Sequence, residues 1–384
     1  MFASLSSNFH LNRPLGELIK KNVHMRITLQ EMSGMDSLRS QIDKISESLR
    51  EDIQDFKNQL NDPNDPVNTT AWHSLPPPAP QMPIVAAVDG GSRSLNTRGS
   101  KILFAQAAGR IMGDGMQNRP WNVSRRSKLV TDDLADDLLS LLRQRLEIAV
   151  CTEILRNDTP KYLLLDGTLE SLFRVGVPSR ISAALDDKKQ VPEAVSEYYD
   201  EIIKYGETLS DFLSSVKETG VNVLGVPKDN YTRRFIPTDS IFTDTTFFSV
   251  VSNYLAGYSD VKEIKALQYL ENLVLGIWKN KGYQIPEGFW KIKSFYCSVK
   301  DKGTPIRIDQ FSSSFIRQDE LLSDLLTLTD ERDWFIPPRL AHERAVVKND
   351  FFEAIYQGVF NSVSEYSPLY ANLILSRSRR SRTQ

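Results

Sequence analysis

Two apolar segments of the chain end in the same way, in an aspartate, glycine and then a small hydroxyl residue. The first is IVAAVDGGS, with its acid at Asp89, and the second is YLLLDGT, with its acid at Asp166. Apolar and β-branched runs closed by glycine are typical of buried strands. The pattern predicts two strands that each end on a carboxylate, at the edge where open α/β sheets place their chemistry. The alternative for each acid is a turn cap, because Asp before Gly is common in turns.

The segments around these acids predict an α/β protein with a mixed sheet flanked by helices. Regularly spaced leucines predict a long helix over 131–156, which carries Glu147. A largely helical insertion is expected at about 181–218, where it could cover a site or contact a partner. Further strands are predicted at 101–112, 221–226, 295–299 and 305–311, and further helices at 239–251 and after residue 334.

The first part of the chain is predicted to be separate from the rest. Apolar residues recur every three or four positions over 35–60, which is typical of an amphipathic helix. The proline-rich segment that follows, up to residue 83, cannot continue a helix. We therefore expect an N-terminal helical arm with the start of a linker over 1–72, and a main domain over 73–384. The arm could be a dimerisation or partner helix, or it could fold back on its own domain.

Composition narrows the class of protein. Hydrophobic residues make up 40% and charged residues 25% of the 384 residues, as in an ordinary soluble globular protein. The 47 basic and 49 acidic residues nearly cancel, so any contact with nucleic acid must come from a local basic patch. The two cysteines have no metal-ligand spacing, and no segment has the length of a membrane span or the pattern of a secretory signal. We expect a cytoplasmic protein with buried thiols and no membrane association.

Three carboxylates could converge in such a sheet: Asp89 and Asp166 at the strand ends, and Glu147 on the helix between them. Mg²⁺ and Mn²⁺ prefer oxygen ligands, and clustered carboxylates without a cation would repel one another. The sequence thus indicates a divalent-metal site. The alternatives are two unrelated turns for the aspartates and a solvated helix face for the glutamate.

Basic residues follow the strand predicted at 221–226. Lys228 stands directly after it, with Arg233 and Arg234 close behind. Lysine is a natural partner for a phosphodiester, although lysine in a surface turn is commoner. Among the four histidines, His342 is the one within a motif, near the start of the last predicted helix. The basic tail 376–384 could touch nucleic acid or be a solvated end.

Taken in order, these motifs resemble the NurA nuclease family over about 84–357. They are VDGGSR, an R-x-x-x-E helix ending in RQRLEIAV, LLLDGTLES, GVPKDNYTRR, a strand pair containing RID, and the PRLAH helix. The resemblance implies an RNase H-like core, a homodimer, and Mn²⁺-dependent cleavage of DNA by 5′-to-3′ exonuclease and single-strand endonuclease activities. It also implies docking on a HerA-type hexameric DNA translocase, in DNA end resection and repair or in antiviral defence.

The resemblance also assigns roles to residues. Asp89, Glu147, Asp166 and His342 match the family's metal ligands, which would hold Mn²⁺ or Mg²⁺, two ions per site, and Lys228 matches its basic catalytic residue. The expected contacts to nucleic acid are Arg93, Lys228, Arg233 and Arg234. The implied chemistry is attack of a metal-activated water on a phosphodiester, which needs no Ser or Cys nucleophile.

The chain departs from the family pattern at two places. Phe335 and Ile336 stand where the family commonly has a tyrosine before the proline of the last motif. Asp309 stands where the family commonly ends a strand on glutamate, so it is a lesser candidate ligand. Asp229 and Asp244, near the basic segment, are further candidates.

Two other classes of function remain open. DGGSRS and LLLDGTLES also resemble the phosphate loops of actin-like sugar kinases, although the last third of the chain offers only isolated glycines such as Gly276. The chain could also be an inactive relative of the nucleases that serves as an adaptor for DNA or for the translocase.

Overall fold

The computed structural model of the chain divides into two units, residues 1–68 and 69–384. It describes residues 39–48, 50, 51 and 54 of the first unit, and residues 70–376 of the second except 115–118, 132–133, 188–189, 229–231, 237–242 and 331–333. Residues 39–48 are helical, as predicted. The rest of the arm helix predicted for 35–60 lies largely outside the described residues, as do Asp229 and most of the basic tail.

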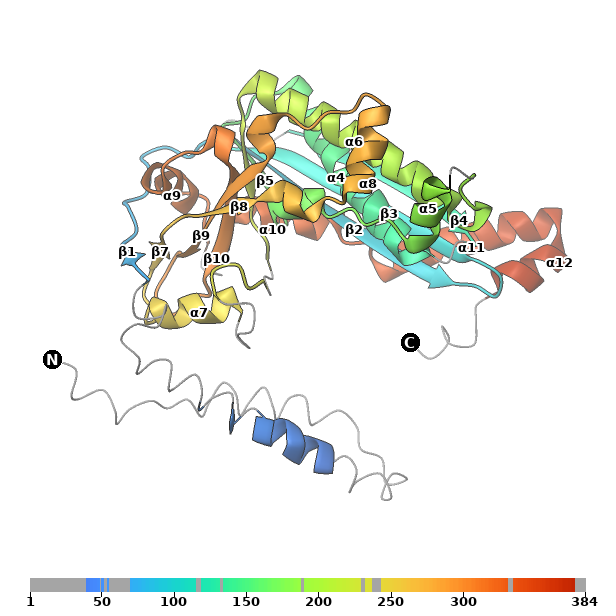
Figure 1. Cartoon of the computed structure of the whole chain (residues 1–384), viewed down its shortest axis with the longest axis horizontal. Helices are drawn as coiled ribbons and strands as arrows, with labels where there is room; N and C mark the ends of the chain where they lie inside the picture. The colour runs from blue at the N-terminus through green and yellow to red at the C-terminus, as the bar shows by residue number, and fades with distance from the viewer. Residues whose placement is uncertain are drawn as a thin grey trace. The chain divides into compact units, whose positions relative to one another are not determined.

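A mixed sheet runs through the described part of the second unit (Figure 1). Its ten strands have the order β1-β7-β9-β10-β6-β5-β2-β3-β4, and β8 pairs with β9. The strands are β1 (Trp72–His73), β2 (Val85–Asn96), β3 (Lys101–Met112), β4 (Asn122–Val130), β5 (Tyr162–Leu165), β6 (Asn222–Gly225), β7 (Gly257–Ser259), β8 (Lys262–Lys265), β9 (Lys291–Ser298) and β10 (Ile306–Phe311). The central strands β2, β5 and β6 are parallel neighbours, and the other pairs are antiparallel.

Helices cover both faces of this sheet, which confirms the predicted fold class. The longer helices are α4 (Ala135–Asn157), α5 (Ser179–Asp186), α6 (Glu193–Thr219), α7 (Asp244–Val251), α8 (Asn272–Asn280), α9 (Gln318–Leu326), α10 (Ile336–Ala345) and α11 (Asn349–Tyr366). The short helical segments are η1 (Leu169–Phe173), η2 (Ala266–Tyr269), η3 (Glu287–Phe289), η4 (Ser312–Ser314), α12 (Pro368–Tyr370) and η5 (Ala371–Leu375).

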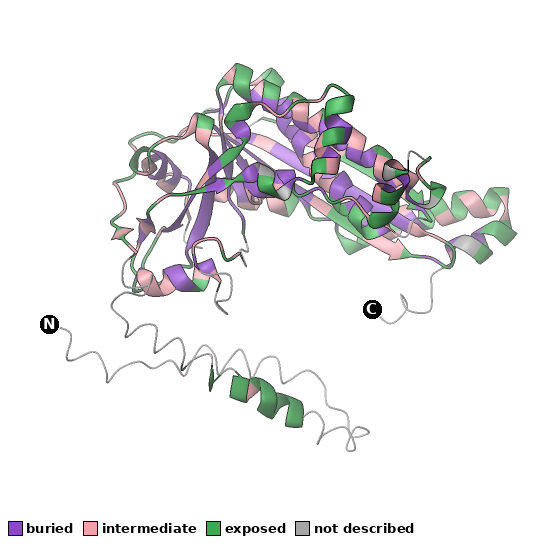
Figure 2. Ribbon diagram, in the orientation of Figure 1, coloured by how far each residue is buried: buried purple, intermediate pink, exposed green. Residues whose placement is uncertain are grey.

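The two faces exist because side chains alternate along the central strands. Val88 and Leu165 pack into a core shared with α4, α6 and α8. Ala87 and Leu164 pack into the opposite core, shared with α9 and α10. In Figure 2 the central strands are accordingly buried over most of their length, between helices whose outer sides are exposed.

The segment predicted as a helical insertion, 181–218, forms α5 and α6. α6 runs beside α4 (Figure 1), and its Ile202, Tyr205 and Leu209 side chains are fully buried. Burial of this apolar stripe makes α6 a core helix of the unit.

β2 differs from the prediction, because the strand does not end at Asp89. It continues to Asn96 and pairs with β3 along its whole length, so Gly90 and Gly91 lie within the strand. What does end here is the parallel pairing with β5, whose last pair is Val88 with Leu165.

The two glycines are needed because helices approach the strand closely at this point. A Cβ atom at Gly90 would lie 2.1 Å from the Glu147 carboxylate on α4. A Cβ atom at Gly91 would lie 2.1 Å from the backbone oxygen of Ala345, at the end of α10. Both distances are far below van der Waals contact. A side chain at Gly90 would displace the Glu147 side chain, and one at Gly91 would have to displace backbone, so the pair belongs to a close packing contact and is not an exit turn.

Four other features bear on the predictions. The last predicted helix is two helices, α10 and α11, with a break at 346–348. β9 and β10 form the predicted antiparallel pair. The polar strand β4, at the edge of the sheet, has no counterpart among the predicted strands. No helix of the described residues has both the length and the apolar character of a membrane span.

The close contact between β2 and α10 gives a first testable prediction. Gly91→Ala should destabilise the protein by about 1–3 kcal/mol, because the added methyl group must displace the end of α10. Urea unfolding followed by circular dichroism measures this change. Ser92→Ala, at the exposed neighbouring position, should leave the midpoint unchanged. Equal midpoints for both variants would contradict the close packing.

Candidate metal centre

Asp89, Asp166 and His342 meet at one point of the second unit. Each offers one ligand atom, and these atoms all lie within 4.8 Å of one another. His342 Nδ1 is 2.7 Å from Asp89 Oδ2 and 3.7 Å from Asp166 Oδ2. Among the described residues this is the one cluster of such side chains with the spacing of a metal site. The structure thus brings together three of the four predicted ligands.

The sheet places the two aspartates side by side. Val88 and Leu165 are the last parallel pair of β2 and β5, so the residues that follow them leave the pairing at the same level. Asp89 then shares its face with Ala87, two residues earlier in the strand, which is the face covered by α10. His342 lies on that helix, next to the buried Ala341.

The end of α10 is fastened to the sheet by a buried glutamine. Gln106 of β3 is 5% exposed, and its Nε2 donates a hydrogen bond of 2.7 Å to the Ala345 backbone oxygen. Its Oε1 accepts a bond of 3.1 Å from Arg125 of β4. Because His342 lies one turn before Ala345, this bond helps to fix the position of the imidazole.

Glu147 approaches the cluster from the α4 side. It packs over Gly90, the residue after Asp89, and forms an ion pair of 3.5 Å with Arg143 one helical turn earlier. Glu147 is outside the three-ligand cluster itself. Its carboxylate is nevertheless close enough for the charges of Asp89 and Asp166 to raise its pKa.

The three acids resist ionising together. Burial raises the pKa of Asp89, against the lowering effect of His342. Burial and the charge of Asp89 raise the pKa of Asp166 to about 6. Burial, followed by the charges of both aspartates, raises the pKa of Glu147 to about 8, although Arg143 acts in the opposite direction. Such a cluster favours either bound protons or a cation.

The donor set fits a divalent cation. Two carboxylates and an imidazole suit ions such as Mn²⁺, and a carboxylate beside them can complete or tune the set. The side chains of Asp89 and Asp166 are 8% and 11% exposed, whereas that of His342 is 39% exposed. The cluster is therefore largely buried, and the imidazole of His342 is its most exposed member.

The predicted basic residues lie in different settings. The backbone N–H of Lys228 donates to Asp166 Oδ1 at 3.2 Å, its side chain is exposed, and its charge lowers the pKa of Asp166. Arg233 is exposed, whereas Arg234 forms an ion pair of 3.3 Å with the buried Glu170. Lys228 is thus the one of these three that is shown beside the cluster. Their contacts with nucleic acid stay predictions.

Arg93 lies further along β2. Its guanidinium donates a hydrogen bond to Asn349 and lies over the ring of Phe352, 5.6 Å from the ring centre. Both partners belong to α11, so the described contacts of Arg93 join β2 to that helix.

The lesser candidate ligands lie outside the cluster. Asp309 is fully buried, forms a 2.7 Å ion pair with Arg307, and accepts a hydrogen bond from the backbone N–H of Leu169. Asp244 accepts hydrogen bonds from the backbone N–H groups of residues 234–236. Both acids hold loops in place. Phe335, at the position of the family's tyrosine, is fully buried in the core beside α10.

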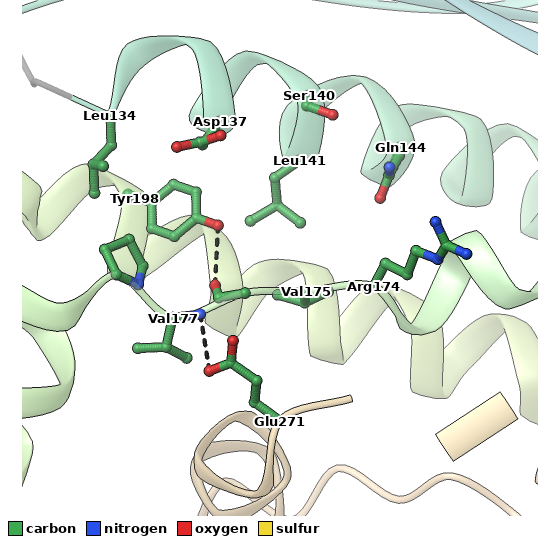
Figure 3. Close-up of a pocket in the computed structure, with 12 residues that line it drawn as sticks. Leu134, Asp137, Ser140, Leu141, Gln144, Arg174, Val175, Val177, Tyr198 and Glu271 are labelled. Atoms are coloured by element: carbon green, nitrogen blue, oxygen red, sulfur yellow. Dashed lines mark hydrogen bonds between the residues drawn. The ribbon is translucent and has the colours of Figure 1, made fainter. Parts of the chain in front are cut away.

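A hollow of about 390 Å³ lies elsewhere, along the first turns of α4 (Figure 3). The segment 174–178 forms one wall, where Tyr198 donates a hydrogen bond to the Gly176 carbonyl and the N–H of Val177 donates one to Glu271. None of the cluster residues lines this hollow. The candidate metal centre is a separate feature.

Sequence reasoning did not single out Gln106 or Arg143. Gln106 is the one polar uncharged side chain in the apolar segment KILFAQAAGRIM, which is a sign of a buried hydrogen bond. Arg143 was visible only as the first residue of R-x-x-x-E, a spacing that allows an i, i+4 ion pair on any helix.

Comparison with known proteins decides the family. The NurA domain model matches residues 83–347, more than half of the chain. The chain belongs to the NurA family. This confirms the resemblance inferred from the motifs. Among curated proteins, no sequence matches this NurA chain.

Solved NurA structures share the fold. The chain superposes on the NurA nuclease from Sulfolobus solfataricus with a TM-score of 0.59 at 16% identity, covering 88% of this chain and 98% of that one. A NurA structure with manganese gives 0.54 at 14% identity, covering 84% and 98%. A NurA structure bound to dAMP and manganese gives 0.50 at 16% identity, covering 83% and 94%. At these identities the likeness shows the fold.

The cluster predicts how this NurA protein binds Mn²⁺. Asp89→Asn, Asp166→Asn and His342→Ala should each weaken binding at least about tenfold to a hundredfold, the effect known even for residues that only support metal ligands. Wild-type affinity should rise with pH between about 6 and 8, because bound Mn²⁺ must displace protons held by acids of raised pKa. Isothermal titration calorimetry measures both effects. Asp136→Asn, an exposed acid on α4, should bind Mn²⁺ like the wild type.

Glu147 gives a separate prediction about stability. Its folded pKa of about 8 lies above its ordinary 4.5, so ionising it costs stability as the pH rises from 4.5 towards 8. Glu147→Gln cannot ionise and should stabilise the metal-free protein near pH 8 by up to about 4 kcal/mol, given about 1.4 kcal/mol for each unit of the rise in pKa from 4.5 to about 8. Thermal unfolding in EDTA tests this, and the gain should vanish near pH 4.5. Glu153→Gln, on the exposed side of α4, is the matched control.

Proposed function

We propose that this NurA-family protein is a metal-dependent deoxyribonuclease that hydrolyses phosphodiesters. The observation that carries the proposal is the meeting of Asp89, Asp166 and His342, with ligand atoms within 4.8 Å of one another. The family adds support, because its solved structures include a nuclease and complexes with manganese and dAMP. The expected cofactor is Mn²⁺ or Mg²⁺, two ions per site.

The finer activity follows the family resemblance. We propose 5′-to-3′ exonuclease and single-strand endonuclease activities, exercised by a cytoplasmic homodimer. The partner is a HerA-type hexameric DNA translocase, and the setting is DNA end resection and repair or antiviral defence. Lys228 and Arg233 supply exposed positive charge on the loop after β6, where a DNA backbone could be held.

Each residue of the proposed site has its own role. Asp89, Asp166 and His342 would hold the cation, with Glu147 beside them. When bound, the cation supplies Lewis-acid stabilisation of the phosphate oxygens and makes a water acidic enough to attack near neutral pH. The carboxylate of Asp89 orients the imidazole of His342 through Nδ1. The backbone N–H of Lys228 orients the Asp166 carboxylate. The side-chain ammonium group of Lys228 would hold the phosphate.

The sugar-kinase alternative lacks support. A phosphate loop needs backbone N–H groups that are open to the ligand. Gly90 and Gly91 instead lie in a strand paired with β3, and the N–H of Gly90 donates to Asp89 Oδ1 at 2.6 Å. An inactive adaptor would bind DNA without cutting it, so a cleavage assay separates it from the nuclease.

The decisive experiment uses linear DNA labelled at the 5′ or the 3′ end, with Mn²⁺ or EDTA. Wild-type protein should cut in Mn²⁺ only, with the order of products giving the polarity, and a HerA-type translocase should stimulate it. Asp89→Asn and Asp166→Asn should lower the rate by about a thousandfold or more, because the cation supplies several kcal/mol of transition-state stabilisation. Asp136→Asn should cut normally. Cleavage that survives in both site variants would refute the proposed centre, and DNA binding without cleavage would favour the adaptor.

A further inference from the structure

Arg143 lies beside the metal centre, and its one described partner is Glu147. It stands on α4, one turn before Glu147, and its Nε is 3.5 Å from Glu147 Oε1. The side chain is 38% exposed, so most of it is covered while its end reaches solvent. Glu147 packs against Gly90, the residue after Asp89, so the ion pair places the guanidinium beside the acidic cluster. In agreement with this position, its charge lowers the pKa of both Asp89 and Glu147.

The guanidinium has unused hydrogen-bonding capacity. Its Nε is buried and has no hydrogen-bond partner among the described residues, and the 3.5 Å ion pair is its one described contact. A guanidinium has five N–H donors in a planar fork, and buried donors are normally satisfied. Arg145, two residues along the same helix, shows the ordinary arrangement, with its Nε donating a hydrogen bond to the buried Glu201.

Its position complements that of Lys228. Lys228 acts on Asp166 from the loop after β6, whereas Arg143 acts on Asp89 and Glu147 from α4. Positive charge therefore reaches the cluster from two separate elements. A phosphodiester bound at the centre would carry negative charge on its non-bridging oxygens. The carboxylates of the site repel such oxygens, whereas the planar guanidinium can donate hydrogen bonds to two of them.

We propose that Arg143 binds the non-bridging oxygens of the phosphate at the metal centre and stabilises the charge that builds there during cleavage. The inference rests on the proposed nuclease function and names a further catalytic residue for it. Glu147 holds the guanidinium in the free protein. With a cation bound, the Glu147 carboxylate would attract the arginine less, and the guanidinium would be able to turn to the phosphate.

A purely structural role makes a different forecast for phosphate. If Arg143 only neutralises Glu147, its removal leaves more negative charge at the centre, and Mn²⁺ would bind at least as tightly, as it would under the proposal. Phosphate would then lose affinity only through general repulsion, which Arg143→Lys would abolish because lysine keeps the charge. The two roles therefore differ in whether Arg143→Lys restores the full affinity for phosphate.

The test measures binding of dAMP to the Mn²⁺-loaded full chain by calorimetry, with Mn²⁺ affinity measured separately. Arg143→Gln should weaken dAMP binding about tenfold to a hundredfold, as expected for a charge-assisted hydrogen-bonded pair, without weakening Mn²⁺ binding. Arg143→Lys keeps the charge but loses the planar set of donors, so its dAMP affinity should lie between those of the wild type and Arg143→Gln. It also shows whether the loss in Arg143→Gln comes only from misfolding. Arg156→Gln, which removes an exposed arginine of α4, should change neither affinity.

Cleavage of labelled DNA under single-turnover conditions completes the test. The cleavage rate of Arg143→Gln at saturating DNA should fall by at least the same factor, and free guanidinium ion should restore part of it. Unchanged dAMP affinity in both Arg143 variants would overturn the inference, even if the wild type cuts DNA. If Arg143→Gln loses dAMP affinity but the wild-type protein cuts no DNA, the phosphate site is supported and the proposed nuclease function is refuted.

Discussion

Repulsion among buried carboxylates is the constraint on which the rest of this site depends. Asp89, Asp166 and Glu147 come together where the parallel pairing of the sheet ends, and burial raises the pKa of each. The protein tolerates them because His342 and Arg143 contribute positive charge or hydrogen bonds at close range. The remaining negative charge favours binding of a divalent cation. The repulsion that destabilises the metal-free protein therefore also provides its affinity for metal.

A second, largely buried network joins the loops that follow β5 and β6. Glu170 of η1 forms ion pairs with Arg307 and Arg234, and Arg307 also pairs with Asp309. η1 follows Asp166 in sequence, and Arg234 belongs to the segment that follows Lys228. The network therefore joins the loops after β5 and β6 beneath the site. Its charges are matched inside the protein, whereas those of the metal centre are left for a ligand.

The residues that meet at the cluster were easier to predict from the sequence than their geometry. The strands and the aspartates at Asp89 and Asp166 follow from residue type and apolar runs, whereas His342 was assigned through the family resemblance. The course of β2 past Asp89 was not, because Gly-Gly signals a turn and a close helix contact equally well, and only the packed fold shows Glu147 and Ala345 above the glycines. Arg143 and Gln106 act through partners far away in sequence, and the polar strand β4 carries no alternating apolar pattern. The bonds that position His342 therefore appear only in three dimensions.

The glycine pair of β2 has one more consequence. At Gly90 and Gly91 the strand has no side chains, so the Glu147 side chain of α4 lies against one face of its main chain and the Ala345 backbone of α10 against the other. A Cβ atom at Gly90 would displace the carboxylate, and one at Gly91 would displace the helix that carries His342. The missing side chains of β2 therefore set how near these two parts of the metal centre can come to each other.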